Sequence, residues 1–156
     1  MEGTFENYSK NLINNRLLRS NDEIDTFEAA REAIAERKNP KDISLLCQAF
    51  DDETEEYEVM FGLVHTIEMY DKTSTAEIAT TEFVKAIPFM ADKATEWLEV
   101  LLFRILNDDD SRLIFARVLG ETDSNIRSYI LRVLKKIVNE DPEEFETKVD
   151  EVMKNM

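Results

Sequence analysis

Residues 51–70, DDETEEYEVMFGLVHTIEMY, open with six carboxylates in eight residues and continue into an amphipathic pattern. At about 100° per residue, one arc of the predicted helix is apolar and forms a core stripe. The apolar arc contains Val59, Met60, Leu63, Val64, Ile67 and Tyr70, and the opposite arc contains Glu58, Phe61, Gly62, His65 and Glu68. An aromatic ring, a glycine and the only histidine of the chain are unusual on a solvated face. We therefore predict a helix over 53–71 with a core face and a second contact face.

The remainder of the chain also has the composition of helices. Glycine and proline number only three each, and no window keeps the period of two that is typical of a strand. The helical segments that we predict are 5–18, 22–37, 42–50, 53–71, 74–86, 90–106, 111–119, 123–139 and 142–154. The connections between them are short, which favours antiparallel neighbours. We expect an all-α fold with about eight helices, an α-α superhelix of three to four antiparallel helical hairpins.

The length of 156 residues predicts a single all-helical domain over 1–156, in which residues 1–20 form a less ordered N-terminal helix. Residues 123–137 resemble the second helix of a HEAT repeat, with Asp123 at the capping position and Arg127 positioned to brace the neighbouring turn. Residues 53–67 follow a looser version of the same pattern. Helix pairs recur about every 35–45 residues, as in such arrays. The superhelix is therefore expected to be HEAT-like and curved.

The net charge is the most unusual property of the composition. There are 34 acidic and 19 basic residues, and the net charge is −15. This charge repels nucleic acid and anionic membranes, and it accelerates the encounter with basic proteins. Many acidic proteins carry such a charge for solubility alone. We expect no nucleic-acid or membrane partner, because no basic stripe occurs anywhere in the sequence.

The sequence predicts a cytoplasmic protein. Cys47 is the only cysteine, which excludes an internal disulfide framework, and its apolar neighbours predict a buried, inert thiol. The first residues lack the basic and apolar regions of a signal peptide. The longest apolar stretch, 97–106, contains Glu99 and Arg104 and is too short to span a bilayer.

Catalytic motifs are lacking. The sequence contains no glycine-rich phosphate loop, no CxxC, no GxSxG and no HExxH, so we expect neither an enzyme nor a cofactor. Glu58, His65 and Glu68 lie near one helical stripe, but the second histidine of a di-metal helical site is missing. The acidic runs 51–56 and 108–110 lack the spacing of an EF-hand loop. They read either as solvated helix starts or as docking surfaces.

Arg104 lies close to Trp97 on the most apolar helical segment, 90–106. A largely buried guanidinium requires a carboxylate partner, and Glu58 and Glu68 on the unusual face of 53–71 are the candidates. A structural ion pair of Arg104 with one of them is therefore one interpretation of that face. Direct contact with a partner protein is the other.

The segments DDETEEYEVMFGLVHTIE (51–68) and EWLEVLLFRILN (96–107) resemble the immunity protein 30 family. The similarity covers roughly residues 25–120. The family consists of small all-α proteins that are associated with bacterial polymorphic and contact-dependent toxin systems. The resemblance implies a cytosolic antidote that binds a cognate toxin domain and blocks it, and it transfers no catalytic residue to this chain.

We expect a basic toxin domain, of which a nuclease is one example, to meet a monomer or weak dimer of this protein by charge steering. The acids of 51–56 are expected to point outward, while aromatic and imidazole side chains supply the anchor contacts. The candidate toxin-binding residues are Asp51, Asp52, Glu53, Glu55, Glu56, Tyr57, Phe61, His65, Asp108, Asp109 and Asp110. The alternatives are a HEAT-like adaptor that binds a cellular protein along its concave side and, more remotely, a metal-dependent enzyme.

Overall fold

The computed structural model describes residues 4–156, and within them all regular structure is helical. The α-helices are α1 (Phe5–Asn14), α2 (Asn21–Ala35), α3 (Ile43–Cys47), α4 (Tyr57–Thr73), α5 (Ala76–Ala86), α6 (Thr95–Leu106), α7 (Asp109–Gly120), α8 (Ser124–Glu140) and α9 (Pro142–Lys154). Two 3₁₀ turns, η1 (Pro40–Asp42) and η2 (Ile87–Met90), precede α3 and follow α5. The predicted all-α fold is confirmed, with one α-helix for each predicted segment.

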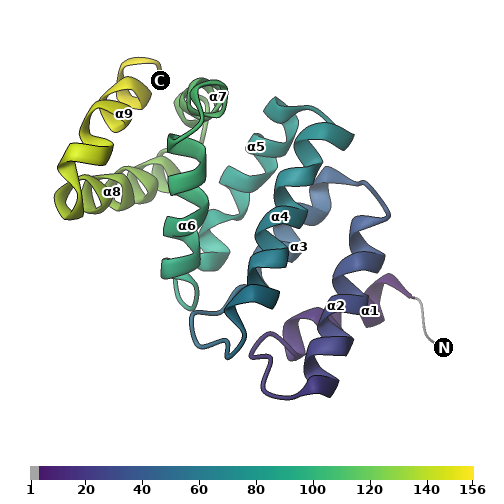
Figure 1. Cartoon of the computed structure of the whole chain (residues 1–156). Helices are drawn as coiled ribbons and strands as arrows, with labels where there is room; N and C mark the ends of the chain where they lie inside the picture. Colours follow the sequence, from purple (N-terminus) through teal and green to yellow (C-terminus); the bar gives the residue numbers. More distant parts are fainter. Residues whose placement is uncertain (1–3) are drawn as a thin grey trace.

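The helices form a curved stack of two layers, which the chain follows from one end to the other (Figure 1). In one layer α3 packs on α5, α5 on α7 and α7 on α9, while α2 packs on α4 in the other. The hairpins α1–α2 and α8–α9 close the two ends of the stack. This is the helical-hairpin superhelix that the short connections predict.

Helices α4 and α6 run parallel and in register. Phe61 of α4 meets Trp97 of α6, and Glu68 of α4 meets Arg104 of α6. Both pairs are 36 residues apart in the sequence, so an equal advance along each helix keeps the partners together. The layer therefore has a common lower end, at the starts of α4 and α6, and a common upper end (Figure 1).

Helix α4 begins at Tyr57, four residues later than predicted, because residues 51–56 are held in a loop. The Asp51 carboxylate accepts a hydrogen bond from the Glu53 backbone N–H, which forms a turn at the start of the loop. The Glu55 N–H donates to the Leu17 carbonyl, and the Asp52 N–H donates to the Lys93 carbonyl. The loop is thereby fastened to two other connections of the fold.

The core lies between the two layers. Cys47 is fully buried there, as predicted, and burial raises the pKa of its thiol. Helix α6 buries five of its apolar side chains: Trp97, Leu98, Leu101, Leu102 and Leu106. Each fully buried leucine of this kind stabilises the fold by about 1.5–3 kcal/mol relative to an exposed one.

The HEAT-like segment makes the local contacts that its pattern suggests. Asp123 caps α8 by accepting hydrogen bonds from the N–H groups of Asn125 (3.0 Å) and Ile126 (3.3 Å). The Arg127 guanidinium donates to the Thr122 carbonyl at 3.0 Å and so braces the turn after α7. These contacts fix the α7–α8 corner, while the wider resemblance to HEAT arrays stays a prediction.

The N-terminal segment 1–20 includes α1, whose N-terminus is capped by the Thr4 hydroxyl. Helix α1 ends at Asn14 and packs against α2. Residues 1–3 lie outside the described residues, and weaker order of 1–20 stays a prediction, as does the division into a single domain.

Candidate functional site

An aromatic cluster marks the lower end of the α4–α6 layer. The Trp97 ring, with 3% of the residue exposed, lies 5.6 Å from Tyr57, 5.8 Å from Phe50 and 5.8 Å from Phe61, measured between ring centroids. Tyr57 remains 58% exposed, so the cluster has a buried base and an open top. The exposed Tyr57 ring is held in place by this packing, and a large ring of this kind is the type of side chain that anchors protein–protein contacts.

Above the cluster, the exposed face of α4 carries an ion pair to α6. The Arg104 guanidinium donates to both Glu68 carboxylate oxygens, at 2.6 and 2.9 Å, and these bonds raise the pKa of Arg104. The His65 Nδ1 atom lies 3.7 Å from the same carboxylate, and the Phe61 ring lies 5.3 Å from the imidazole. The ion pair therefore links two parallel helices. It occupies part of the α4 face for which direct contact with a partner protein is the other interpretation.

The environment of this ion pair differs from the expectation. The Arg104 side chain is 41% exposed and that of Glu68 is 36% exposed, so the guanidinium is not largely buried. Glu58 is exposed and is not the partner of Arg104. His65, whose side chain is 60% exposed, is free to contact another protein. At this exposure the pair contributes about 1 kcal/mol or less.

Asp51 and Asp52 point inward rather than outward, which corrects the expectation that residues 51–56 all face solvent. The Asp51 carboxylate is 7% exposed and binds the Arg16 guanidinium at 2.9 Å. Asp52 accepts hydrogen bonds from the N–H groups of Glu96 (3.1 Å) and Trp97 (3.2 Å), and so caps α6. Their carboxylates stabilise the fold because both satisfy donors that would otherwise be unpaired.

Four glutamates near the start of α4 do face solvent, and we call them the acidic entrance: Glu53, Glu55, Glu56 and Glu58. Within residues 4–156, none of their carboxylates forms an ion pair or a hydrogen bond. Tyr57, which is exposed, lies among them in the sequence, and the charge of Glu55 also acts on the Arg19 guanidinium. The acidic entrance thus combines exposed carboxylates, none of which forms an ion pair or hydrogen bond within residues 4–156, with an exposed aromatic side chain in one stretch of the chain.

The second acidic run lies at the upper end of the layer. Asp108 caps α7 through the Ser111 N–H at 2.9 Å, and hydrogen bonds from Ser111 hold the pKa of Asp108 below its ordinary value. Asp109 binds the buried Arg112 guanidinium at 2.7 Å while staying 90% exposed. Asp110 is exposed and, within the described residues, has no ion-pair partner. Only Asp110 is therefore uncompensated in this run.

The structure does not bring the two acidic runs together. Asp52 lies at the start of α6 and Asp108 just beyond its end, and the twelve residues of this helix span about 18 Å. A standard interface of about 800 Å² per partner is roughly 30 Å across. One protein partner can therefore cover both ends of the layer, whereas a small ligand cannot.

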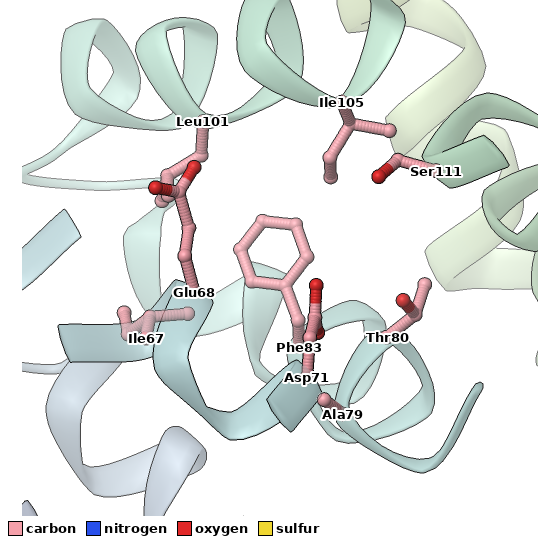
Figure 2. Close-up of a pocket in the computed structure, with 9 residues that line it drawn as sticks. All are labelled: Ile67, Glu68, Asp71, Ala79, Thr80, Phe83, Leu101, Ile105 and Ser111. Carbon is pink, nitrogen blue, oxygen red and sulfur yellow. The ribbon is translucent and has the colours of Figure 1, made fainter. Parts of the chain in front are cut away.

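Two residues that matter here were missed in the sequence. Arg16, the partner of Asp51, lies 35 residues away from it and has no local pattern to reveal this role. Asp71 lines a cleft between α4, α5, α6 and the first turn of α7, together with Glu68, Phe83 and Ser111 (Figure 2). Asp71 is exposed by surface area, yet partial desolvation at the cleft raises its pKa to about 6, and the neighbouring carboxylates of Glu68 and Asp108 add to this shift.

Metal ligands do not gather in the part of the chain that the structure describes. Among residues 4–156, no group of three or more His, Cys, Asp or Glu side chains is placed to hold a metal ion. The expected stripe of Glu58, His65 and Glu68 instead supplies one ion pair to Arg104. No helix in residues 4–156 has the length and apolarity needed to cross a membrane.

Fold and surface together define an all-α stacked-helix protein whose exposed chemistry is acidic and aromatic. Residues 14–115 match the family model of immunity protein 30, and the chain therefore belongs to the immunity protein 30 family. The resemblance found in 51–68 and 96–107 is thereby confirmed, and both segments lie inside the matched region. Comparison with curated proteins and with solved structures found no match. By its family the protein is an immunity protein, a class that in general is not enzymatic.

Proposed function

We propose that this protein binds a cognate toxin domain of a bacterial contact-dependent or polymorphic toxin system and neutralises it by occlusion. The two proteins form a one-to-one complex in the cytoplasm, in which the immunity protein covers a cationic substrate site of the toxin. The toxin domain is basic, and nucleases are one class with such a site. The observation that carries this proposal is the acidic entrance, whose four exposed carboxylates form no ion pair or hydrogen bond within residues 4–156 and flank the exposed Tyr57 in the sequence.

The contacts divide into steering and anchoring groups. The acidic entrance supplies long-range attraction, because its charges are solvated and close together. Tyr57 and, higher on α4, Phe61 and His65 supply the area that is desolvated on binding. Asp110 extends the charged rim at the other end of the layer. Asp51 and Asp52 act indirectly, by holding the loop in place.

The first experiment is expression of the toxin domain encoded beside this gene, with and without this protein. We expect rescue of growth and copurification in a one-to-one complex. Toxicity that persists despite soluble expression of both proteins would contradict the proposal. A HEAT-like adaptor, the alternative reading, would leave the toxin active and would copurify with a cellular protein instead.

The second experiment locates the interface. The triple variant Glu53→Lys, Glu55→Lys, Glu56→Lys reverses the acidic entrance, and the matched control Glu143→Lys, Glu146→Lys, Asp150→Lys changes the net charge equally on exposed positions of α9. We expect the entrance triple to slow association about tenfold or more and to flatten its salt dependence, while the control has a smaller effect. If both triple variants slow association equally, the attraction comes from the net charge and not from the acidic entrance. If the entrance triple has no effect, the acidic entrance is not part of the interface.

A further inference from the structure

The cleft at the upper end of the α4–α6 layer has apolar walls and an uncompensated carboxylate. Its walls are formed by the side chains of Ile67, Ala79, Phe83, Leu101 and Ile105. Its cavity volume is about 60 Å³, and the cleft is partly open to solvent. Pockets for whole small ligands span about 300–1,000 Å³. A partly open cleft of this size therefore fits a single side chain better than a whole cofactor.

The polar groups of the cleft gather where Asp71 reaches it from α4. In Figure 2 the Asp71 carboxylate and the Phe83 ring point into the same opening, with the hydroxyls of Thr80 and Ser111 across from them. Asp71 forms no hydrogen bond or ion pair with any of residues 4–156. Glu68, by contrast, is paired with Arg104, and Asp108 is occupied by the cap of α7. Asp71 is thus the acceptor that a ligand can use.

We propose that this cleft receives the side chain of a lysine from the toxin domain. The four methylenes of lysine lie along the apolar walls while its ammonium reaches Asp71, as amphipathic side chains do at such edges. Three separate acceptors, the Asp71 carboxylate and the hydroxyls of Thr80 and Ser111, match the three rotatable donors of an ammonium. The identity of the partner rests on the proposed function, whereas the chemistry of the cleft does not.

The electrostatics agree with a cationic occupant. The pKa of Asp71 is raised to about 6 by desolvation and by the charges of Glu68 and Asp108, which means that the ionised carboxylate is destabilised at this position. A cation in the cleft removes this destabilisation. A metal ion is a poorer occupant, because no three His, Cys, Asp or Glu side chains within residues 4–156 are arranged to ligate one.

The first test uses n-butylammonium, the lysine side-chain analogue, and methyl NMR of the full chain at pH 7.5. We expect saturable shifts at Ile67, Leu101 and Ile105, with n-butanol binding about tenfold more weakly because it lacks the charge. Asp71→Asn should abolish the difference between the two probes, and the matched control Asp92→Asn, an exposed aspartate in the turn before α6, should preserve it. Equal shifts from both probes, or shifts unchanged in Asp71→Asn, would overturn the assignment.

The second test uses the toxin domain itself. Asp71→Asn should weaken the complex about tenfold, mainly through faster dissociation, whereas Asp92→Asn should not. Unchanged toxin affinity in Asp71→Asn would overturn the lysine contact even if n-butylammonium binds. Failure of the wild-type protein to bind any toxin would instead refute the proposed function and would leave the probe titration as the test of the cleft.

Discussion

Asp51 is the one acid of residues 51–58 that is buried and forms an ion pair, and its replacement by alanine removes that pair. The variant loses the 2.9 Å contact with the Arg16 guanidinium and the 2.8 Å hydrogen bond from the Glu53 N–H. Removing one partner of a buried ion pair costs about 3–5 kcal/mol, because the other charge stays buried without compensation. The Arg16 side chain is 21% exposed and also donates to the Ile13 carbonyl at 2.9 Å, which favours the lower end of that range.

We therefore expect Asp51→Ala to reduce the free energy of unfolding by about 3 kcal/mol and the Tm by about 9 °C. Asp51→Asn retains an acceptor for the Glu53 N–H and should cost about 2 kcal/mol, which is the ionic part of the loss. Urea unfolding at pH 7, followed by far-UV circular dichroism, measures both values. The matched control is Glu56→Ala, which removes an exposed carboxylate and should stay within about 0.5 kcal/mol of wild type.

The double-mutant cycle with Arg16→Ala completes this test. If the two side chains stabilise each other, the double variant loses less than the sum of the single variants, by about 1–3 kcal/mol. Additive effects, or a loss in Asp51→Ala no larger than that in Glu56→Ala, would refute the assignment of Asp51 to the interior. In that case Asp51 would rejoin the solvent-facing acids.

The remaining predictions concern three other side chains. Asp52→Ala should lower the free energy of unfolding by about 1–2 kcal/mol because α6 loses its cap, and thermal unfolding no different from that of Glu53→Ala would contradict this. Native Cys47 should react with a thiol reagent about 100-fold more slowly than the unfolded chain, because burial raises its pKa and blocks access; equal rates would argue against its burial. The raised pKa of Asp71, about 6, means that the folded state holds this proton more tightly than the unfolded state, so the contribution to stability is full below about pH 4 and is lost as the pH rises through 6. Complete conversion of the shift gives about 3 kcal/mol, which solvent screening of this exposed residue reduces to about 1 kcal/mol. Asp71→Asn should therefore exceed wild type in stability by about 1 kcal/mol at pH 7.5 and match it near pH 4, and a gain that is independent of pH would exclude this origin.

The helices could be predicted from the sequence because their signals are local. The apolar arc of 53–71 is buried as its spacing indicates, and Asp123 caps α8 next to it in the chain. The start of α4 was predicted four residues early because the acids of 51–56 resemble a helix entrance. Two of them instead bind partners at sequence separations of 35 and 44 residues, which no local pattern reveals.

The candidate site shows the same limit. Glu58 and Glu68 were equal candidates for Arg104, since both belong to the same face of α4. The parallel register of α4 and α6 distinguishes them. Phe61 packs against Trp97, so the residues seven positions further along each helix, Glu68 and Arg104, also meet. Asp71 carries no motif at all, and its environment exists only because four helices meet around the cleft.

The loop of residues 51–56 is tied to Arg16, to Leu17, to Lys93 and to the first N–H groups of α6. A free loop would have to be ordered when its charges meet a partner, at about 1 kcal/mol per residue of backbone. For six residues this amounts to about 6 kcal/mol, or roughly four orders of magnitude in Kd. Here that entropy is lost during folding rather than during association. In the proposed complex, Asp51 and Asp52 would therefore contribute to affinity without touching the partner. Removing their hydrogen bonds should weaken binding even though every exposed glutamate remains in the chain.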